Sequence, residues 1–256
     1  MNLERQQHGL VQVLTLNRPD AANSLDPDLL TALATAFDEI AADDATQVAV
    51  LTGAGERIFC AGMDLRAFSQ GGSGVAAKPK NDRAAGSELF KDLCPKPVIA
   101  AVNGAAVGGG FELVLACDLV VAAEHARFGL PEVKRGLLAG GGGTLLGTRL
   151  PLSLALEVAL SGELVDAARA EQWGLVNRVV PAAELLDTAL ALATTIAANG
   201  PIALRTTKKL VRRAVLDDPK LGWGTREELS AVFGSEDAKE GAMAFLEKRP
   251  ANWTGR

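Results

Sequence analysis

Short apolar runs that alternate with a helical pattern constrain the fold of this chain more than any other feature of its sequence. The runs at residues 48–53, 97–102 and 118–122 have the length of single strands, and a helical pattern that begins at about Gly109 separates the last two. Strands joined through a helix pair in parallel, and a parallel sheet is covered on both faces, so its strands are apolar throughout. The sequence therefore predicts an α/β core.

Two further elements are predicted before this core. A strand is expected at residues 10–16, followed by a turn at 17–20. A helix begins next, because Asp26 is suited to the N-cap and Pro27 to the first helical position. Apolar residues then recur at the three- and four-residue steps of an amphipathic helix, at Leu30, Leu33, Phe37 and Ile40.

The chain changes character after Pro201, where only helical patterns remain. Helices are predicted at about 202–216, 225–233 and 236–248. The last of them carries a broad apolar face, made of Ala238, Ala242, Met243, Phe245 and Leu246. Few elements remain to cover that face, so we expect this tail to pack against the core and against a neighbouring subunit.

The composition is that of an ordinary soluble globular protein, with 256 residues, 48% hydrophobic and 22% charged. A net charge of −5 argues against nucleic acid as the main partner. The basic pairs Lys208-Lys209 and Arg212-Arg213 are expected on a solvated helix face. No apolar run approaches the ~20 residues of a membrane span, and the first residues do not form a signal peptide. We therefore expect a cytoplasmic protein without a membrane partner.

The three cysteines, Cys60, Cys94 and Cys117, lack the close spacing of a zinc site. The two histidines, His8 and His125, are too far apart in the sequence to suggest a metal centre. The cysteines are therefore interpreted as reduced thiols, and no metal is expected.

Two glutamates occupy positions where a surface carboxylate is not expected. Glu112 follows the triple glycine 108–110 and leads an apolar run, and Glu132 lies in the segment Phe-Gly-Leu-Pro-Glu-Val at 128–133, shortly before the glycine run 140–143. An ionised carboxylate among apolar neighbours is costly unless something pairs with it. Two carboxylates converging on one cavity would differ in pKa, as a site with one acid and one base requires.

Each of these features also has a simpler, structural interpretation. Taken singly, Glu112 could be a first-turn carboxylate that complements the helix dipole, and Glu132 a helix cap. The loop 59–65 could be a plain turn in which Asp64 caps the next helix, and Asp118 is expected to cap or pair structurally. Glycines at a helix start could also bind a phosphate. The chain lacks, however, both the G-x-G-x-x-G dinucleotide pattern and a Walker lysine.

As a set, these motifs resemble those of the enoyl-CoA hydratase (crotonase) family, and the resemblance covers nearly the whole chain. They include Phe-Cys-Ala-Gly-Met-Asp-Leu at 59–65, Gly-Gly-Gly-Phe-Glu-Leu at 108–113 and Phe-Gly-Leu-Pro-Glu at 128–132. The other segments that carry the resemblance are 96–104, 117–118, 140–144, 235–241 and 245–249.

The resemblance implies a spiral of ββα turns over residues 1–198, containing the active site, and a helical region over 199–256 that assembles trimers, often paired into hexamers. It implies that the N–H groups of Met63 and Gly109 hold a thioester oxygen and that Glu112 and Glu132 are the catalytic carboxylates. It further implies that the Gly140 N–H helps to place the water. The implied coenzyme A contacts are Ala21, Ala22, Ala61, Asp64, Leu65 and Lys248. Ala139 is a departure, because many hydratases carry proline there, but it removes no catalytic group.

The implied activity is that of an enoyl-CoA hydratase, a lyase that adds water reversibly to trans-2-enoyl-CoA to give 3-hydroxyacyl-CoA, as in fatty acid β-oxidation. Coenzyme A is then part of the substrate, and no separate cofactor is expected. A double-bond isomerase and a carnitinyl-CoA dehydratase stay open within the family. An isomerase needs one carboxylate, so the two glutamates favour hydration. A non-catalytic acyl-CoA-binding relative would have no use for a buried acid–base pair. The acyl pocket wall is expected from the loop 66–90.

Overall fold

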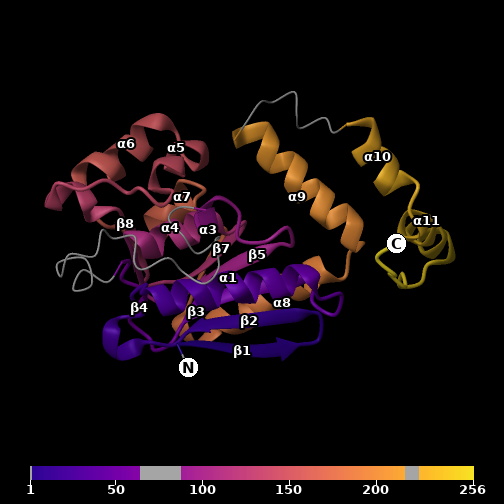
Figure 1. The fold of residues 1–256 in the computed structure, drawn as a ribbon, viewed down its shortest axis with the longest axis horizontal. Coiled ribbons are helices and arrows are strands. Elements are labelled where there is room, and N and C mark those ends of the chain that lie inside the picture. Colours follow the sequence, from indigo (N-terminus) through magenta and orange to yellow (C-terminus); the bar gives the residue numbers. More distant parts are fainter. Residues whose placement is uncertain (1, 64–87, 217–224) are drawn as a thin grey trace.

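The computed structural model describes residues 2–63, 88–216 and 225–256. Its main element is a six-stranded sheet in the order β1-β2-β3-β5-β7-β10 (Figure 1). The β1–β2 pair is antiparallel and the other neighbours are parallel. The strands are β1 (Leu3–His8), β2 (Val11–Leu16), β3 (Val48–Gly53), β5 (Val98–Val102), β7 (Leu119–Ala123) and β10 (Arg178–Val180). The strands predicted for the core are confirmed to within one residue, whereas β1 and β10 were not predicted.

A smaller sheet runs in the order β4-β6-β8-β9, formed by β4 (Ile58–Cys60), β6 (Ala105–Val107), β8 (Arg127–Gly129) and β9 (Val165–Asp166). Three successive passages of the chain place one strand in each sheet: β3 then β4, β5 then β6, and β7 then β8. This arrangement confirms the expected spiral. The strands of the smaller sheet have two or three residues each, which is too short for an apolar pattern to reveal.

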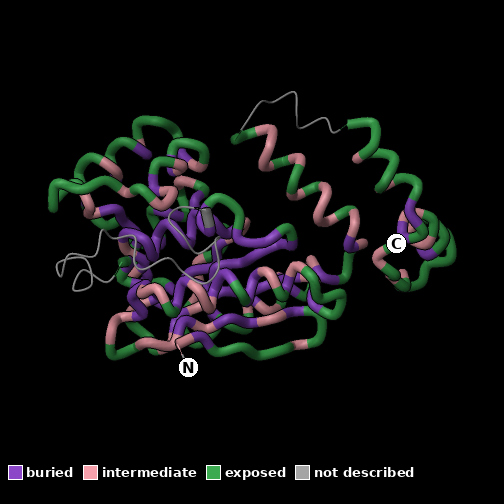
Figure 2. The backbone as a smooth tube through the Cα atoms, in the orientation of Figure 1, coloured by how far each residue is buried: buried purple, intermediate pink, exposed green. Residues whose placement is uncertain are grey.

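Helices cover both faces of the large sheet. On one face α1 (Pro27–Ala42) packs its apolar stripe against β2, β3 and β5, and on the other face α8 (Leu185–Ala197) contributes Ala189 and Ala193 to a second apolar cluster. Alternate strand residues point to the two sides, as Val50 and Leu51 illustrate. The central strands β3, β5 and β7 are accordingly almost wholly buried, whereas the edge strand β1 is mostly exposed (Figure 2). The predicted start of α1 is confirmed, since Asp26 accepts a hydrogen bond from the Leu29 N–H at 2.8 Å.

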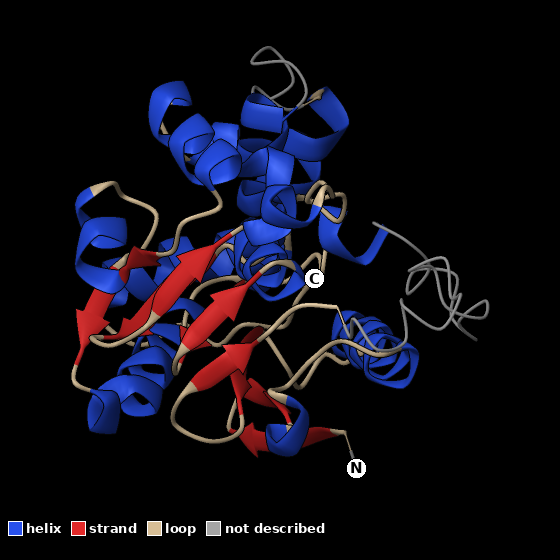
Figure 3. Cartoon of the chain, turned by 90° about the vertical axis from the view of Figure 1, so that its left-hand side faces the viewer, coloured by secondary structure: helices blue, strands red, loops and turns tan. Residues whose placement is uncertain are grey.

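The remaining helices of the core are short, and Figure 3 shows helices on more than one side of the strands. They are α3 (Glu88–Lys91), α4 (Gly109–Ala116), α5 (Leu146–Arg149), α6 (Leu152–Ser161) and α7 (Ala167–Gln172), with 3-10 turns at η1 (Pro19–Ala21), η3 (Pro131–Arg135), η4 (Gly143–Leu145) and η5 (Ala182–Glu184). The helix expected from Gly109 is confirmed as α4. It follows β6 directly, which places its first turn at the end of that strand.

The three helices of the tail are confirmed as α9 (Pro201–Leu216), α10 (Arg226–Phe233) and α11 (Glu236–Glu247). The predicted boundary at residues 198 and 199 falls between α8 and α9. Figure 1 shows α9 crossing beside the core and α11 at the far end of the molecule from α4. On α11 the expected apolar face is open to solvent, with Phe245 83% and Leu246 74% exposed.

The expectation of a solvated basic face on α9 is wrong for two of the four residues. Lys208 and Arg212 turn inward, and both pair with the carboxylate of Asp118, at 2.7 Å and 3.1 Å. Lys209 and Arg213 pair instead with Glu228 of α10. The contacts of Lys208 and Arg212 dock α9 against the core, because the same Asp118 carboxylate also accepts the Val98 N–H at 2.8 Å.

Among the described residues no single helix is long and apolar enough to span a membrane; one pair, Ala182–Ala197 with Pro201–Leu216, meets the length and composition test only together and is bent by 107°.

Asp118→Asn should loosen the docking of α9. The substitution keeps an acceptor for the Val98 N–H but leaves two cations without their counterion, and removing one partner of a buried ion pair typically costs about 3 kcal/mol or more. Urea unfolding measures the loss. Glu163→Gln is the control, because its ion pair with Lys134 is exposed and should contribute little. Equal effects of the two substitutions would contradict this account of Asp118.

Candidate active site

The Gly62–Met63 peptide group is held so that its N–H faces the start of α4. The Gly62 carbonyl accepts a hydrogen bond from the Leu25 N–H at 2.8 Å. Because the peptide unit is planar and trans, the Met63 N–H points the opposite way. A Cβ atom on Gly62, whose φ is +89°, would lie 2.9 Å from the Gly109 nitrogen, so only glycine permits this approach.

A second peptide group, Gly108–Gly109, is held in the same way. The Gly108 carbonyl accepts the Glu112 N–H at 2.9 Å as the first bond of α4, so the Gly109 N–H points out of the helix. A Cβ atom on Gly109 would lie 3.5 Å from the Met63 nitrogen. The two amides named by the sequence are therefore neighbours, and within the described part of the chain neither donates a hydrogen bond. Such a pair can hold an oxygen that gains negative charge.

Glu112 is buried on the first turn of α4, only 5% exposed. Its Oε1 accepts the Gly143 N–H at 2.8 Å. Its Oε2 faces Gly141, where an added Cβ atom would lie 2.6 Å away. The second glycine run thus wraps the carboxylate with backbone, and its amides stabilise the ionised form.

Glu132 reaches the same place from the 3-10 turn after β8. The β6–β8 pairing brings the two segments together, and the Gly108 N–H donates to the Gly129 carbonyl at 2.9 Å. Glu132 Oε1 lies 2.9 Å from the position of a Cβ atom on Gly108, whose φ is +57°. Its Oε2 is buried and has no hydrogen-bond partner among the described residues. That oxygen is available to a water or substrate.

Burial raises the pKa of both carboxyl groups above their ordinary value of 4.5. For Glu112, the Gly143 N–H opposes this effect, and the negative charge of Glu132 raises the pKa further. For Glu132, a hydrogen bond from its own backbone N–H and then the positive charge of Arg135 oppose the effect of burial on the pKa. The charge on Glu132 therefore acts on the pKa of Glu112, as expected for two carboxyl groups that face one site.

The glycine run supplies contacts that the sequence did not assign. Gly140, expected near the water, is exposed, and the amide bonded to Glu112 belongs to Gly143. A Cβ atom on Gly143 would lie 2.4 Å from the Cβ of Ala139, so Ala139 packs directly behind the amide that contacts Glu112. Nothing in the sequence pattern distinguishes one glycine of the run from the next, because which of them faces Glu112 depends on the turn geometry.

Three of the positions implied for coenzyme A lie together. The Ala61 N–H donates to the Ala22 carbonyl at 3.0 Å, and Ala21 precedes Ala22 at the end of η1. Asp64 and Leu65, together with most of the expected pocket wall at 66–90, lie outside the described residues. Lys248 ends α11, at the far end of the molecule from α4 in Figure 1.

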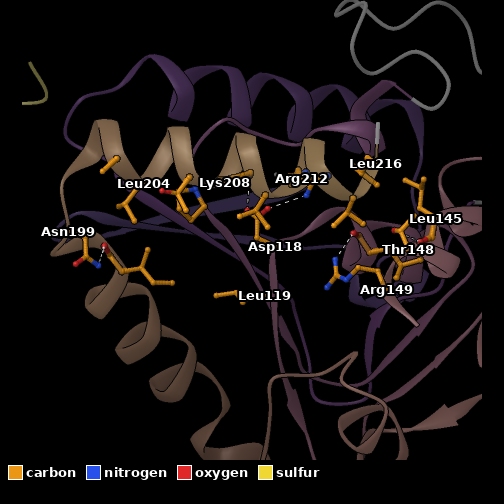
Figure 4. A pocket seen from close by; sticks show the side chains of 17 residues that line it. Asp118, Leu119, Leu145, Thr148, Arg149, Asn199, Leu204, Lys208, Arg212 and Leu216 are labelled. Carbon is orange, nitrogen blue, oxygen red and sulfur yellow. Dashed lines mark hydrogen bonds and ion pairs between the residues drawn. The ribbon is translucent and has the colours of Figure 1, made fainter. Parts of the chain in front are cut away.

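Asp118 belongs to a separate place. It lies beside a cavity of about 570 Å³ between α9 and the core, and Figure 4 shows its carboxylate directed at Lys208 and Arg212. The nearby Arg149 guanidinium donates to the Leu115 and Cys117 carbonyls at the end of α4. Asp118 therefore pairs structurally, as expected. The nearby cationic side chains of Lys208, Arg212 and Arg149 all bond to backbone carbonyls, and the first two also bond to the Asp118 carboxylate. Among the described residues no cluster of His, Cys, Asp or Glu is arranged to hold a metal ion.

Comparisons with known proteins agree with this geometry. A family model described as enoyl-CoA hydratase/isomerase matches residues 5–256. The chain is similar to the carnitinyl-CoA dehydratase of Proteus mirabilis (strain HI4320), 41% identical over 254 residues, which cover 97% of this chain and 96% of that protein. Among solved structures it is similar to enoyl-CoA hydratases from Mycobacterium tuberculosis H37Rv and Mycobacterium marinum, at 43% and 44% identity. Each has a TM-score of 0.91 and covers 100% of this chain and 99% of that chain.

Glu112→Gln should stabilise the protein in a pH-dependent way. A folded-state pKa above 4.5 means that the folded protein binds the proton more tightly than the unfolded chain does. The contribution of Glu112 to stability is therefore greatest below its unfolded pKa and is lost as the pH rises through its folded pKa. Urea unfolding over a pH series should show that the free energy of unfolding of the variant increases relative to that of the parent as the pH rises towards neutral. A stability difference that does not change with pH would contradict the raised pKa.

Proposed function

The chain belongs to the enoyl-CoA hydratase/isomerase family, and from this premise we propose that it is a hydro-lyase that adds water reversibly to trans-2-enoyl-CoA thioesters. One observation carries the proposal: two outward-facing amides and two carboxyl groups of raised pKa meet at the first turn of α4. Hydration needs all four groups. A protein that only binds acyl-CoA needs the amides alone.

The proposed role of the amides follows from the charge that the reaction develops. When water attacks the β-carbon of a conjugated thioester, electron density moves onto the thioester oxygen. The N–H groups of Met63 and Gly109 are already oriented by the bonds to Leu25 and Glu112, so they stabilise that charge without reorganisation.

The two carboxyl groups have different surroundings, and we assign them different roles. Glu112 accepts a backbone N–H, which favours its ionised form, so it is suited to remove a proton from the attacking water. Glu132 has a buried oxygen without a donor, which suits a protonated group that delivers its proton to the α-carbon. The hydroxyl joins the β-carbon and the proton joins the α-carbon. The proton gained by Glu112 then returns to Glu132 through the solvent.

Carnitinyl-CoA dehydration is a second candidate because the curated relatives at 41% identity carry that name. The reaction is the same chemistry in reverse, on an acyl chain with a quaternary ammonium. Apart from the Glu112 carboxylate, the described side chains that meet the second glycine run include the apolar Phe90, Leu130 and Ala139. Apolar neighbours favour an uncharged acyl chain over a cation. Dehydration rates on 3-hydroxybutyryl-CoA and carnitinyl-CoA, compared at equal concentration, separate the two candidates.

The proposal includes assembly and location. The uncovered apolar side chains of the tail, with Phe233 76% and Phe245 83% exposed, support a homotrimer or a hexamer of paired trimers. In such an assembly Lys248 would contact the coenzyme A of a neighbouring subunit. Sedimentation of the full chain tests this part, and a stable monomer at micromolar concentration would contradict it. We also propose a cytoplasmic location and a role in fatty acid or related acyl-CoA metabolism.

Glu112→Gln and Glu132→Gln should each reduce the hydration of crotonyl-CoA by a factor of about 10²–10⁴, because general acid–base catalysis typically contributes that much. Each substitution keeps size and hydrogen bonding, so folding and ligand binding should survive. Because the pair acts on one water, the double variant should be little worse than the worse single variant. The loss of conjugated thioester absorbance measures the rate. If only one substitution mattered, an isomerase acting on a 3-enoyl thioester would be the better assignment.

Gly109→Pro should lower the hydration rate by about 10²–10³, the usual effect of losing one oxyanion donor. Proline fits the first helical position, and its ring takes the place of the amide hydrogen. Gly109→Ala is the matched control: it keeps the N–H, and its Cβ atom would meet the Leu25 side chain at a tolerable 3.3 Å. A folded Gly109→Pro protein as active as Gly109→Ala would show that this amide does not hold the oxygen.

A further inference from the structure

Asn23 is fully buried in the turn before α1 and has a backbone conformation that is unusual for a residue other than glycine. Its φ is +51°, and that of Ala22 before it is +52°. Two consecutive left-handed residues are disfavoured for L-amino acids and persist only when their surroundings fix them. Asparagine tolerates this region better than most residues do.

The side chain of Asn23 is what fixes this turn to the rest of the fold. Its Nδ2 donates to the Ala54 and Ile58 carbonyls, both at 3.0 Å, and its Oδ1 accepts the Arg18 N–H at 3.0 Å. Ala54 and Ile58 lie at the two ends of the loop that joins β3 to β4. The buried amide of Asn23 therefore links the turn to the start of β4, the strand that precedes Met63.

The backbone on either side of Asn23 then pairs with the loop that carries Met63. The Ala22 carbonyl accepts the Ala61 N–H at 3.0 Å, and the Leu25 N–H donates to the Gly62 carbonyl at 2.8 Å. The second of these bonds sets the plane of the Gly62–Met63 peptide. The left-handed turn at Asn23 is what lets both bonds form within four residues.

We propose that Asn23 is a positioning residue that aims the Met63 N–H at the thioester oxygen, an inference that rests on the proposed function of that N–H. Asn23 touches no ligand, since it is 0% exposed. It acts by holding the Met63 loop at Ile58 and by presenting Ala22 and Leu25 to Ala61 and Gly62. Its loss should therefore weaken one interaction of the ligand, the bond to the carbonyl oxygen, and leave the others intact.

A pair of ligands isolates that bond. Butyryl-CoA has the thioester oxygen, and S-butyl-CoA, a thioether, lacks it. Two variants test the residue: Asn23→Asp has the same shape but faces two carbonyls with an acceptor, and Asn23→Gly keeps the left-handed backbone without the side chain. Asn177→Ala is the control, because the Asn177 side chain accepts the Val120 N–H, joining β10 to β7 at the opposite edge of the large sheet.

Calorimetric titration should show the parent binding butyryl-CoA more tightly than S-butyl-CoA. Both Asn23 variants should bind butyryl-CoA on the order of 3- to 10-fold more weakly, the usual effect of one hydrogen bond, with S-butyl-CoA affinity unchanged. In the same variants kcat for crotonyl-CoA should fall more than KM rises, and the pH profile of Asn23→Gly, which adds no titratable group, should not move. The Asn177→Ala protein should keep the parent's preference.

The possible failures are distinguishable. A parent that binds the two ligands equally would overturn the proposed oxygen-binding function and this inference with it. A parent that prefers butyryl-CoA, together with Asn23 variants that keep that preference, would overturn the inference alone. Equal weakening for both ligands, or loss of folding in both variants, would show that Asn23 only supports the fold and would likewise overturn it.

Discussion

The site depends on two backbone carbonyls that are committed to hydrogen bonds inside the fold. Because Gly62 O and Gly108 O are held by Leu25 and Glu112, the N–H groups of Met63 and Gly109 are turned outward as neighbours. No side chain supplies these donors, so the spiral itself must bring β4 beside the start of α4. Gly62 permits a backbone approach that a Cβ atom at this position would block.

The two proposed catalytic carboxyl groups differ from these amides, because burying them is energetically unfavourable for the folded protein. Burial raises the pKa of Glu112 and Glu132, and different groups offset it: backbone amides of the second glycine run at Glu112, and at Glu132 its own backbone N–H followed by the charge of Arg135. An unequal environment is what lets two identical side chains act as base and acid. The left-handed backbone of Ala22 and Asn23 before α1 is also energetically unfavourable, and it lies where the Met63 loop is held by hydrogen bonds.

The sequence predicted β2, β3, β5 and β7 of the large sheet, α1, α4 and the tail helices because their apolar patterns are long enough to read. It did not predict β1, whose residues are mostly polar and lie at the edge, the three-residue strand β10 at the other edge, or the short strands of the smaller sheet. The pairing of Met63 with Gly109 and of Glu112 with Glu132 came from family resemblance, since no periodicity links residues so far apart. Lys208 and Arg212 were wrongly predicted to be solvated, because a pattern of charges in the sequence does not reveal a buried counterion. The three hydrogen bonds of the Asn23 side chain likewise leave no local pattern in the sequence.

The central claim is that this site places water on an enoyl thioester. Turnover of crotonyl-CoA in oxygen-18 water, followed by mass spectrometry of the product, tests it most directly. The account predicts 3-hydroxybutyryl-CoA carrying the label at the β-carbon, with the conjugated absorbance lost in parallel. An unlabelled product with a shifted double bond, or tight binding without turnover, would contradict it.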